Sequence, residues 1–272
     1  MTSPKVELKP CFLTPKRLQP ELPLFVYLPG MDGTGQLLRS QTAGLEAGFD
    51  VRCLAIPRDD LTSWDVLTNN VLDLIHAELE KSACREVYLC GESFGGCLAQ
   101  KVAIKAPKLF KRIVLINSAS AFHLRPFLGW LSQLTPLVPS CLYDIGGLAL
   151  LPFLANLSRI SRSDRHELVK SIRYVPPQTV LWRISLLREF YVDDTQLRSL
   201  NQPVLVIVGS QDRLLPSLEE AKRLTNVLPN AKMLVLPNCG HACLLEADIN
   251  LYEIMREENF LTRDVPILEA QI

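Results

Sequence analysis

The sequence predicts an α/β protein with a mostly parallel central sheet, flanking helices and a helical cap inserted after the strand near residues 112–117. Short β-branched runs alternate with segments of helical period, which is the pattern of parallel strands joined by crossover helices. A serine between glycines directly follows one run, and the alternation breaks over residues 119–196. The 272 residues are enough for one large domain of this class.

Six runs are expected to form strands and four segments to form helices. The strands are expected over residues 24–28, 51–56, 86–90, 112–117, 204–208 and 233–236. The helices are expected over residues 63–79, 94–106, 218–227 and 249–257, and Thr62 with Asp65 resembles a capping box for the first of them. We assign residues 1–118 and 197–272 to the core and residues 119–196 to the cap.

The two halves of the expected cap differ in composition. Residues 127–157 are rich in leucine, proline and phenylalanine, whereas residues 159–189 set a row of basic side chains against an apolar face. The basic residues are Arg159, Arg162, Arg165, Lys170, Arg173, Arg183 and Arg188. Two interpretations of the second half stay open, namely surface helices that pack on the sheet and a basic face that contacts anionic lipid headgroups.

Charge and composition exclude several classes of protein. The chain has 29 basic residues (Lys and Arg) and 29 acidic residues (Asp and Glu), so its formal net charge is zero. It therefore has no excess positive charge that would attract nucleic acid. Hydrophobic residues make up 48% and charged residues 21%, which excludes a disordered chain. The longest apolar stretches fall far short of the roughly 20 residues that a membrane span needs.

Cysteine usage and the first residues predict the compartment. Eight cysteines are scattered without a C-x-x-C pair, so we expect reduced thiols in a cytoplasmic-type compartment. Residues 1–22 show neither a secretory signal nor a transit peptide, and an already processed form would look the same.

Ser93 is the candidate nucleophile. The expected strand over residues 86–90 runs directly into Gly91-Glu92-Ser93-Phe94-Gly95-Gly96 and then into a helical pattern. At such a turn the serine takes a strained backbone conformation that lifts its Oγ clear of the sheet, and the flanking positions leave no room for a Cβ. The pentapeptide alone would also fit a glycine-rich turn, but the strand before it and the helix after it favour a nucleophile.

The base should be a histidine, because a nucleophilic serine needs a group that takes its proton. His241 follows a strand in a short glycine-containing loop and is the strong candidate among four histidines. We expect His76 and His166 to be solvated, and His123 either to be structural or to line a pocket. Cys239 and Cys243 flank His241, but this spacing fits no common zinc site, so no metal is expected.

The acid should follow a strand and lie between Ser93 and His241 in chain order. Asp212 fits, because it stands four residues after the apolar run 204–208 and at the same sheet edge as Ser93 and His241. Asp193 and Asp194 stand before that run, so we interpret them as loop residues at the opposite edge.

Backbone N–H groups are needed to bind the oxygen of a tetrahedral intermediate. We expect one from Phe94, next to the nucleophile, and the other from Met31, in the glycine-rich segment 28–35. A phosphate-binding loop is the alternative for this segment, but it lacks the lysine of a P-loop and does not match the dinucleotide fingerprint. No cofactor is therefore expected.

With Ser93, Asp212 and His241 in this order, and a cap before Asp212, the chain resembles the α/β-hydrolase superfamily over nearly its whole length. Segments 28–35, 91–96 and 209–212 are similar to the hydrolase part of the plant and cyanobacterial esterase/lipase/thioesterase group that includes phytyl ester synthases.

That resemblance implies transfer of fatty acyl chains onto phytol or diacylglycerol, and a thylakoid surface if the chain is cyanobacterial or plastidic. Plant members carry a second, acyltransferase-like domain that this sequence lacks. The usual His-Gly before the oxyanion residue is Pro29-Gly30 here, and the first two antiparallel strands of the fold are barely visible in residues 6–18.

The expected function is serine-dependent acyl transfer through a Ser93 acyl-enzyme, from a lipophilic ester or thioester to water or an alcohol. A small-molecule hydrolase or lyase of the same fold and a non-catalytic ligand-binding scaffold are the alternatives. The cap carries more apolar side chains than one helical face can bury, so we expect an acyl tunnel or a membrane-facing mouth; closed packing of the cap is the alternative. The expected substrate-binding residues are His123, Phe127, Trp130, Leu148 and Leu151.

Overall fold

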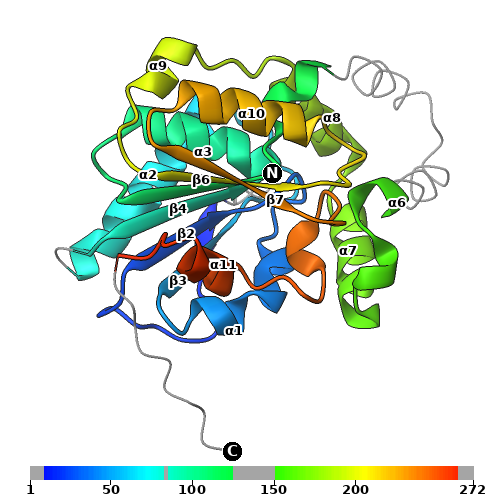
Figure 1. Ribbon diagram of the computed structural model, residues 1–272, viewed down its shortest axis with the longest axis horizontal. Helices are drawn as coiled ribbons and strands as arrows, with labels where there is room; N and C mark the ends of the chain where they lie inside the picture. The colour runs from blue at the N-terminus through cyan, green and yellow to red at the C-terminus, as the bar shows by residue number, and fades with distance from the viewer. Residues whose placement is uncertain (1–8, 83–84, 125–150, 263–272) are drawn as a thin grey trace, which may run out of the picture.

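Seven strands form one sheet in the computed structural model, which describes residues 9–82, 85–124 and 151–262 (Figure 1). The strands are β1 (Cys11–Leu13), β2 (Leu24–Leu28), β3 (Asp50–Ala55), β4 (Val87–Glu92), β5 (Arg112–Ile116), β6 (Val204–Gly209) and β7 (Ala231–Leu236). Their order is β1-β3-β2-β4-β5-β6-β7, with β1 antiparallel and every other pair parallel. The predicted mostly parallel sheet is therefore confirmed.

Burial on both faces explains why the strands read as continuous apolar runs. All residues of β2, β4 and β6 are buried, as expected when helices cover both faces of a parallel sheet. All six expected strands are present, with ends that differ by no more than two residues. At the start of the described chain, β1 pairs in register with β3 from Cys11 opposite Ala55 to Leu13 opposite Cys53.

Helices and single helical turns cover the sheet. The α-helices are α1 (Thr42–Leu45), α2 (Trp64–Lys81), α3 (Phe94–Lys105), α6 (Leu151–Leu154), α7 (Arg162–Tyr174), α8 (Pro177–Arg188), α9 (Asp194–Arg198), α10 (Ser217–Val227) and α11 (Leu251–Glu257). The 3-10 turns are η1 (Gln36–Ser40), η2 (Ala119–Leu124), η4 (Leu157–Arg159) and η5 (Cys243–Leu245).

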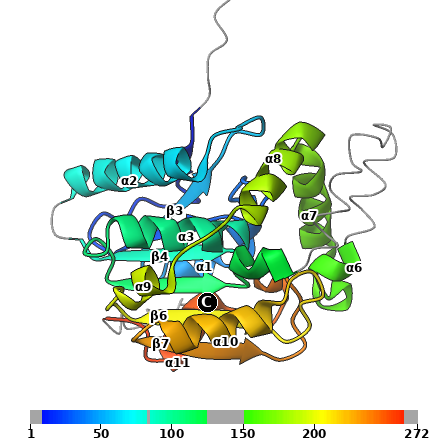
Figure 2. The ribbon, with the colours of Figure 1, turned by 90° about the horizontal axis from the view of Figure 1, so that it is seen from above.

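Two apolar clusters lie on opposite faces of the sheet. One joins the sheet to α2, α3 and α10 through residues such as Val71, Leu98 and Leu224. The other joins it to α1 and α11 through Leu45 and Met255. Figure 1 shows the layers from the side, with α3 and α10 above the strands and α1 and α11 below them, and Figure 2 shows α2, α3 and α10 lying across one face of the sheet. The helices on both faces leave the carboxyl edge of the sheet to the loops that follow the strands.

The start of α2 differs from the expected capping box at Thr62 and Asp65. Both the N–H and the hydroxyl of Thr62 donate to the Asp60 carboxylate instead. Ser63 therefore becomes the N-cap, and its hydroxyl accepts a hydrogen bond from Val66 N. A local turn through Asp60 thus moves the cap by one residue.

The segment between β5 and β6 contains η2 and α6 to α9 in its described part. Leu186 and Leu187 of α8 join the cluster shared with α2 and α3, and Arg39 of η1 pairs with Asp164 of α7 at 3.0 Å. The division into a core and a cap over residues 119–196 stays a prediction. Within the described residues, the helices are too short or too polar to cross a lipid bilayer.

Candidate active site

Ser93 lies at a strained turn between β4 and α3. Its φ is 54° and its ψ is −114°, and its N–H donates to Ile116 O of β5 at 2.9 Å. A Cβ at Gly95 would lie 2.0 Å from Leu28 O, and one at Gly91 would lie 2.3 Å from Gly95 O. Glycine at these two positions therefore lets the helix pack directly on the strand ends, which holds Ser93 above the sheet.

The side chains of Ser93, His241 and Asp212 form one hydrogen-bonded row. His241 Nε2 lies 2.9 Å from Ser93 Oγ, and His241 Nδ1 lies 2.7 Å from Asp212 Oδ2. The other carboxylate oxygen of Asp212 accepts from Leu214 N and Leu215 N. Parallel strands β4, β6 and β7 end at the same edge of the sheet, which brings the three residues together as the sequence predicts.

Burial and charge set the protonation of this row. Burial alone would lower the pKa of His241, but the charge and hydrogen bond of Asp212 and the charge of Glu92 outweigh it and raise the pKa. Burial opposes ionisation of Asp212, yet the charge and hydrogen bond of His241 keep the pKa of Asp212 below its ordinary value. The row thus combines an ionised carboxylate with an imidazole that binds a proton readily.

Asn117 ties the strand ends together. Its Nδ2 donates to His241 O at 2.6 Å and to Gly240 O at 3.2 Å, and its Oδ1 accepts from Gly209 N at 2.9 Å. Asn117 directly follows β5 and is buried, with a positive φ of 42°. One side chain therefore joins the end of β6, which precedes Asp212, to the loop after β7 that carries His241.

The glycine-rich loop, residues 29–35, lies against Ser93. A Cβ built on Gly30 would be 3.7 Å from Ser93 Cβ, and Gly33 N donates to Gly30 O to close a turn. Met31 lies in this turn. Phe94 is the first residue of α3, where helix N–H groups have no partner within the helix. The expected roles of the Met31 and Phe94 N–H groups as oxyanion donors stay predictions.

Glu92 is a buried carboxyl group that the sequence analysis did not single out. It is the last residue of β4, and the hydroxyl of Tyr27 on β2 donates a hydrogen bond to its Oε2. Burial raises the pKa of Glu92 to about 7, against the hydrogen bond from Tyr27 and the charge of His241. Its position directly before the nucleophile was the available signal, but the Tyr27 partner lies too far away in sequence to be recognised.

Residues 57–248 of the chain match the family model of the α/β hydrolase fold. The chain belongs to the α/β-hydrolase family. Among curated relatives, this α/β hydrolase is 32% identical to phytyl ester synthase 1, chloroplastic, of Arabidopsis thaliana over 262 residues, 87% of this chain and 37% of that protein. The chain thus spans less than two fifths of that relative, and its resemblance to the phytyl ester synthase group is confirmed.

Smaller relatives match the α/β hydrolase over most of their own length. The 2-hydroxymuconate semialdehyde hydrolase of Pseudomonas putida is 28% identical over 86% of this chain and 82% of that protein. The solved structure of MenH from S. aureus superposes with a TM-score of 0.74 at 17% identity, covering 93% of this chain and all of that chain. The structural likeness confirms the fold of this hydrolase.

The predicted substrate-binding residues of the hydrolase are only partly described. Phe127, Trp130 and Leu148 lie outside the described residues. His123 is exposed in η2. Leu151 of α6 packs against a small apolar cluster that includes Ala242, the residue after His241. Leu151 therefore belongs to the same apolar cluster as the residue that follows His241. Substrate binding by these residues stays a prediction.

The other histidines, acids and cysteines considered above lie outside the hydrogen-bonded row. His76 and His166 are exposed, as expected. Asp193 lies at the end of the loop before α9, as expected, and caps that helix in a capping box with Gln196. Asp194 is the first residue of α9 rather than a loop residue, and it pairs with Arg223. The loop interpretation was wrong for Asp194 because a helix of one short turn leaves little periodic signal in the sequence. Cys239 and Cys243 are buried free thiols, and burial raises the pKa of both.

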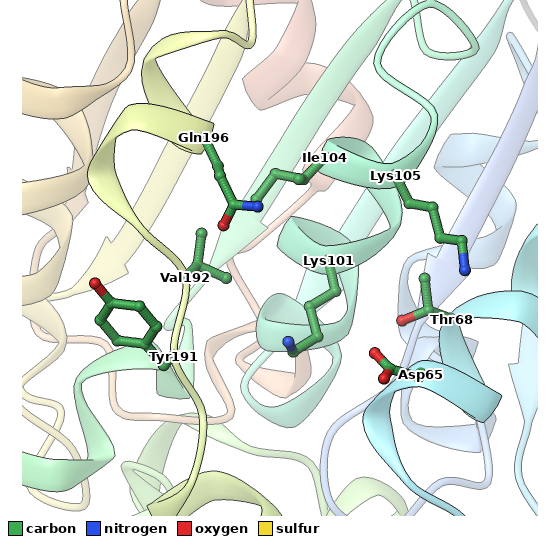
Figure 3. Close-up of a pocket in the computed structure, with 8 residues that line it drawn as sticks. All are labelled: Asp65, Thr68, Lys101, Ile104, Lys105, Tyr191, Val192 and Gln196. Atoms are coloured by element: carbon green, nitrogen blue, oxygen red, sulfur yellow. The ribbon is translucent and has the colours of Figure 1, made fainter.

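A hollow of about 160 Å³ lies between α2, α3 and α9 (Figure 3), and no member of the hydrogen-bonded row lines it. Its lining consists of Asp65, Thr68, Lys101, Ile104, Lys105, Tyr191, Val192 and Gln196. Neither a serine nor a histidine lines it. This hollow therefore offers no second serine–histidine pair to the α/β hydrolase.

Proposed function

We propose that this α/β hydrolase transfers acyl groups from a lipophilic ester or thioester through a covalent intermediate on Ser93. The observation that carries the proposal is the row from Ser93 Oγ through His241 to Asp212, with distances of 2.9 Å and 2.7 Å. Such a row lets an imidazole take the serine proton while a carboxylate stabilises the imidazolium that forms.

The reaction has two halves that use the same residues. Ser93 Oγ attacks the acyl carbon, its proton passes to His241 Nε2, and a tetrahedral oxyanion forms. The bond from the acyl carbon to the leaving oxygen or sulfur then breaks, and His241 returns the proton to the leaving group. Water or an alcohol next attacks the acyl-enzyme, gives its proton to His241 and releases Ser93 with its proton restored.

Two backbone N–H groups, those of Met31 and Phe94, are proposed to bind the oxyanion. The loop that carries Met31 runs beside Ser93, because a Cβ built on Gly30 would lie 3.7 Å from Ser93 Cβ, and Phe94 opens α3. The amino end of a helix carries a partial positive charge that favours an anion there. Both groups therefore lie on the elements that border the nucleophile.

A lipophilic substrate is supported by exposed apolar side chains on η2 and α6. Leu124 of η2 is 56% exposed and Phe153 of α6 is 48% exposed, and Leu151 of α6 packs against the small apolar cluster to which Ala242 belongs. The phytyl ester synthase relative, named for a long-chain ester, points the same way. We propose fatty acyl donors, with water or a long-chain alcohol such as phytol as the acceptor, and peripheral contact with a plastid or cyanobacterial membrane.

Hydrolysis of a small polar substrate is the second candidate. The coverage of the relatives favours this candidate. The chain covers 82% of the length of 2-hydroxymuconate semialdehyde hydrolase but only 37% of the length of phytyl ester synthase 1. The same row of residues serves both reactions, so the substrate pocket decides between them.

Active-site labelling with product analysis tests the proposal. A fluorophosphonate probe should label the purified protein on Ser93, as located by peptide mass spectrometry, and should not label Ser93→Ala. Incubation with palmitoyl thioester, galactolipid or diacylglycerol, with and without phytol, should release fatty acid or form phytyl ester. Absence of labelling would exclude the acyl-enzyme, and labelling with turnover of short polar esters alone would favour the second candidate.

A further inference from the structure

Arg183 of α8 is a buried arginine with unusual partners. Only 2% of the residue is exposed. Its Nη1 donates to Met31 O at 2.7 Å, and its Nη2 donates to Pro57 O at 3.1 Å. Both acceptors are backbone carbonyl oxygens, one in the glycine-rich loop after β2 and the other just after β3. The guanidinium therefore joins a helix of the inserted segment to two loops of the core.

The loop is shaped to receive this guanidinium. Gly33 has a φ of 67°, and a Cβ at this position would lie 2.9 Å from Arg183 Nη1. Asp32 lies in the same turn, and Thr34 N and the Thr34 hydroxyl hold its carboxylate. Burial lowers the pKa of Arg183, and the charge of Asp32 opposes this effect. An arginine side chain stays protonated even so, because its ordinary pKa lies above 12.

We propose that Arg183 is a positioning residue for the oxyanion hole, holding the glycine-rich loop so that Met31 N–H points toward the oxygen that forms at Ser93. This inference rests on the proposed acyl transfer. A loop with glycine at positions 30, 33 and 35 has many backbone conformations, and a bond to Met31 O restricts the peptide that follows the proposed donor. Preorganised donors stabilise a transition state more than mobile ones.

Other contacts hold α8 in place when Arg183 is changed. Trp182 Nε1 donates to Thr62 O at 2.9 Å, and Trp64 Nε1 donates to Leu186 O at 2.9 Å. Leu186 and Leu187 also pack in the main apolar cluster. Loss of the guanidinium therefore removes a clamp on the loop while the helix keeps its anchors.

The test compares Arg183→Met, Arg183→Lys and Arg188→Met. Methionine keeps the apolar stem, lysine keeps the charge but cannot reach two carbonyls with a planar fork, and Arg188 is an exposed residue of the same helix. Active sites are counted by end-point titration with the fluorophosphonate. The values of kcat and KM are then measured per titrated site with a nitrophenyl butyrate ester, together with the Ki of a trifluoromethyl ketone, which forms a tetrahedral adduct with a serine.

We expect Arg183→Met to lower kcat by about 10- to 100-fold per titrated site, with KM within about twofold of the wild-type value. The Ki of the ketone should rise by a similar factor. The kcat and Ki of Arg183→Lys should lie between those of Arg183→Met and the wild type, and those of Arg188→Met should match the wild type. A merely structural role would lower the number of titrated sites and leave kcat per site and Ki unchanged, which would overturn the inference.

The failure of the inference can be separated from the failure of the proposed function. Full turnover by Ser93→Ala would overturn the acyl-enzyme itself. If Ser93→Ala is inactive while Arg183→Met keeps the wild-type kcat and Ki, only the positioning role is overturned. If Arg183→Met does not fold, Arg183→Lys provides the same comparison, and wild-type kcat and Ki in that variant count against the inference.

Discussion

The hydroxyl of Tyr27 donates a hydrogen bond to the carboxyl group of Glu92, the residue that directly precedes Ser93. Both side chains are buried in the sheet, on adjacent strands β2 and β4. The charge of Glu92 raises the pKa of His241. A carboxyl group that titrates near neutral pH therefore lies close enough to the imidazole to affect its protonation.

Glu92→Gln should move the acid limb of the pH profile to lower pH. His241 must be neutral to take the proton of Ser93, so activity rises with pH through the pKa of His241. The charge of Glu92 raises that pKa, and a neutral glutamine removes this contribution. The buried titratable groups near Glu92 besides His241 include Tyr27, Asp32 and the thiols of Cys90 and Cys243.

The measurement is kcat/KM between pH 5 and 9 for Glu92→Gln and for Glu80→Gln, an exposed glutamate of α2, as the matched control. Glu80→Gln should keep the wild-type profile. An acid limb that stays in place in Glu92→Gln, or moves to higher pH, would show that Glu92 does not act on His241.

Much of the sheet could be predicted because buried parallel strands are marked by short continuous apolar runs. β2 has the predicted bounds, and Ser93, Asp212 and His241 were recognised because each follows such a run. The helical turns η1 and α1, residues 36–45, were not predicted, since elements of four or five residues show too little of the helical period.

The contacts of Arg183 and Asn117 could not be predicted for a different reason. Arg183 contacts a carbonyl oxygen 152 residues away in sequence, and Asn117 contacts one 124 residues away. Backbone acceptors carry no residue-type signal, so no spacing or motif indicates such a pair. The sequence shows that residues 159–189 contain many basic side chains, but nothing in their spacing distinguishes buried Arg183 from exposed Arg188.

Removing any member of the hydrogen-bonded row should abolish most turnover. Ser93→Ala and His241→Ala should each lower kcat by on the order of 10⁴-fold or more, because the covalent step depends on both. Asp212→Asn should lower kcat less, by on the order of 10³-fold, because it disorients the imidazole without removing it. The measurement is steady-state kinetics, with circular dichroism to confirm folding.

Asp193→Asn is the matched control for the acid. Asp193 caps α9 and forms no part of the row, so its variant should keep wild-type kcat. A larger loss in Asp193→Asn than in Asp212→Asn would show that the acid is wrongly assigned.

Gly95→Ala should destabilise the strand-to-helix turn. The added methyl group would lie 2.0 Å from Leu28 O, a backbone atom that cannot move aside without shifting β2. We expect a loss of about 3 kcal/mol or more in the free energy of unfolding. The measurement is urea or thermal unfolding of the purified variant.

Gly30→Ala provides the comparison for Gly95→Ala. Its Cβ would meet its nearest neighbours at 3.6 and 3.7 Å, which is ordinary contact, so its unfolding should stay close to that of the wild type. Equal stability of the two variants would mean that the helix does not pack on the strand end as closely as described.

Longer acyl chains should be better substrates if the apolar side chains near Ala242 form an acyl-binding surface. Each additional buried methylene contributes about 0.8 kcal/mol, so kcat/KM should rise roughly fourfold per CH₂ until the surface is filled. A series of nitrophenyl esters or thioesters from acetyl to palmitoyl, kept below their aggregation limits, gives the measurement. A flat or falling profile beyond butyryl would exclude a lipid substrate.

The side chain of Asn117 has a consequence for building chimaeras from this protein. It bonds to the loop of His241 and to the end of β6, which precedes Asp212, from a position two residues before the predicted cap. The segment between β5 and β6 bonds to the His241 loop as well, because Ala242 N donates to Leu154 O at 2.7 Å and Arg159 pairs with Glu246. A chimaera that exchanges this segment therefore keeps the Asn117 bonds but has to reproduce these contacts beside His241. If the positioning role proposed above holds, a grafted segment without an arginine at the position of Arg183 would change the acyl preference and would also lower kcat.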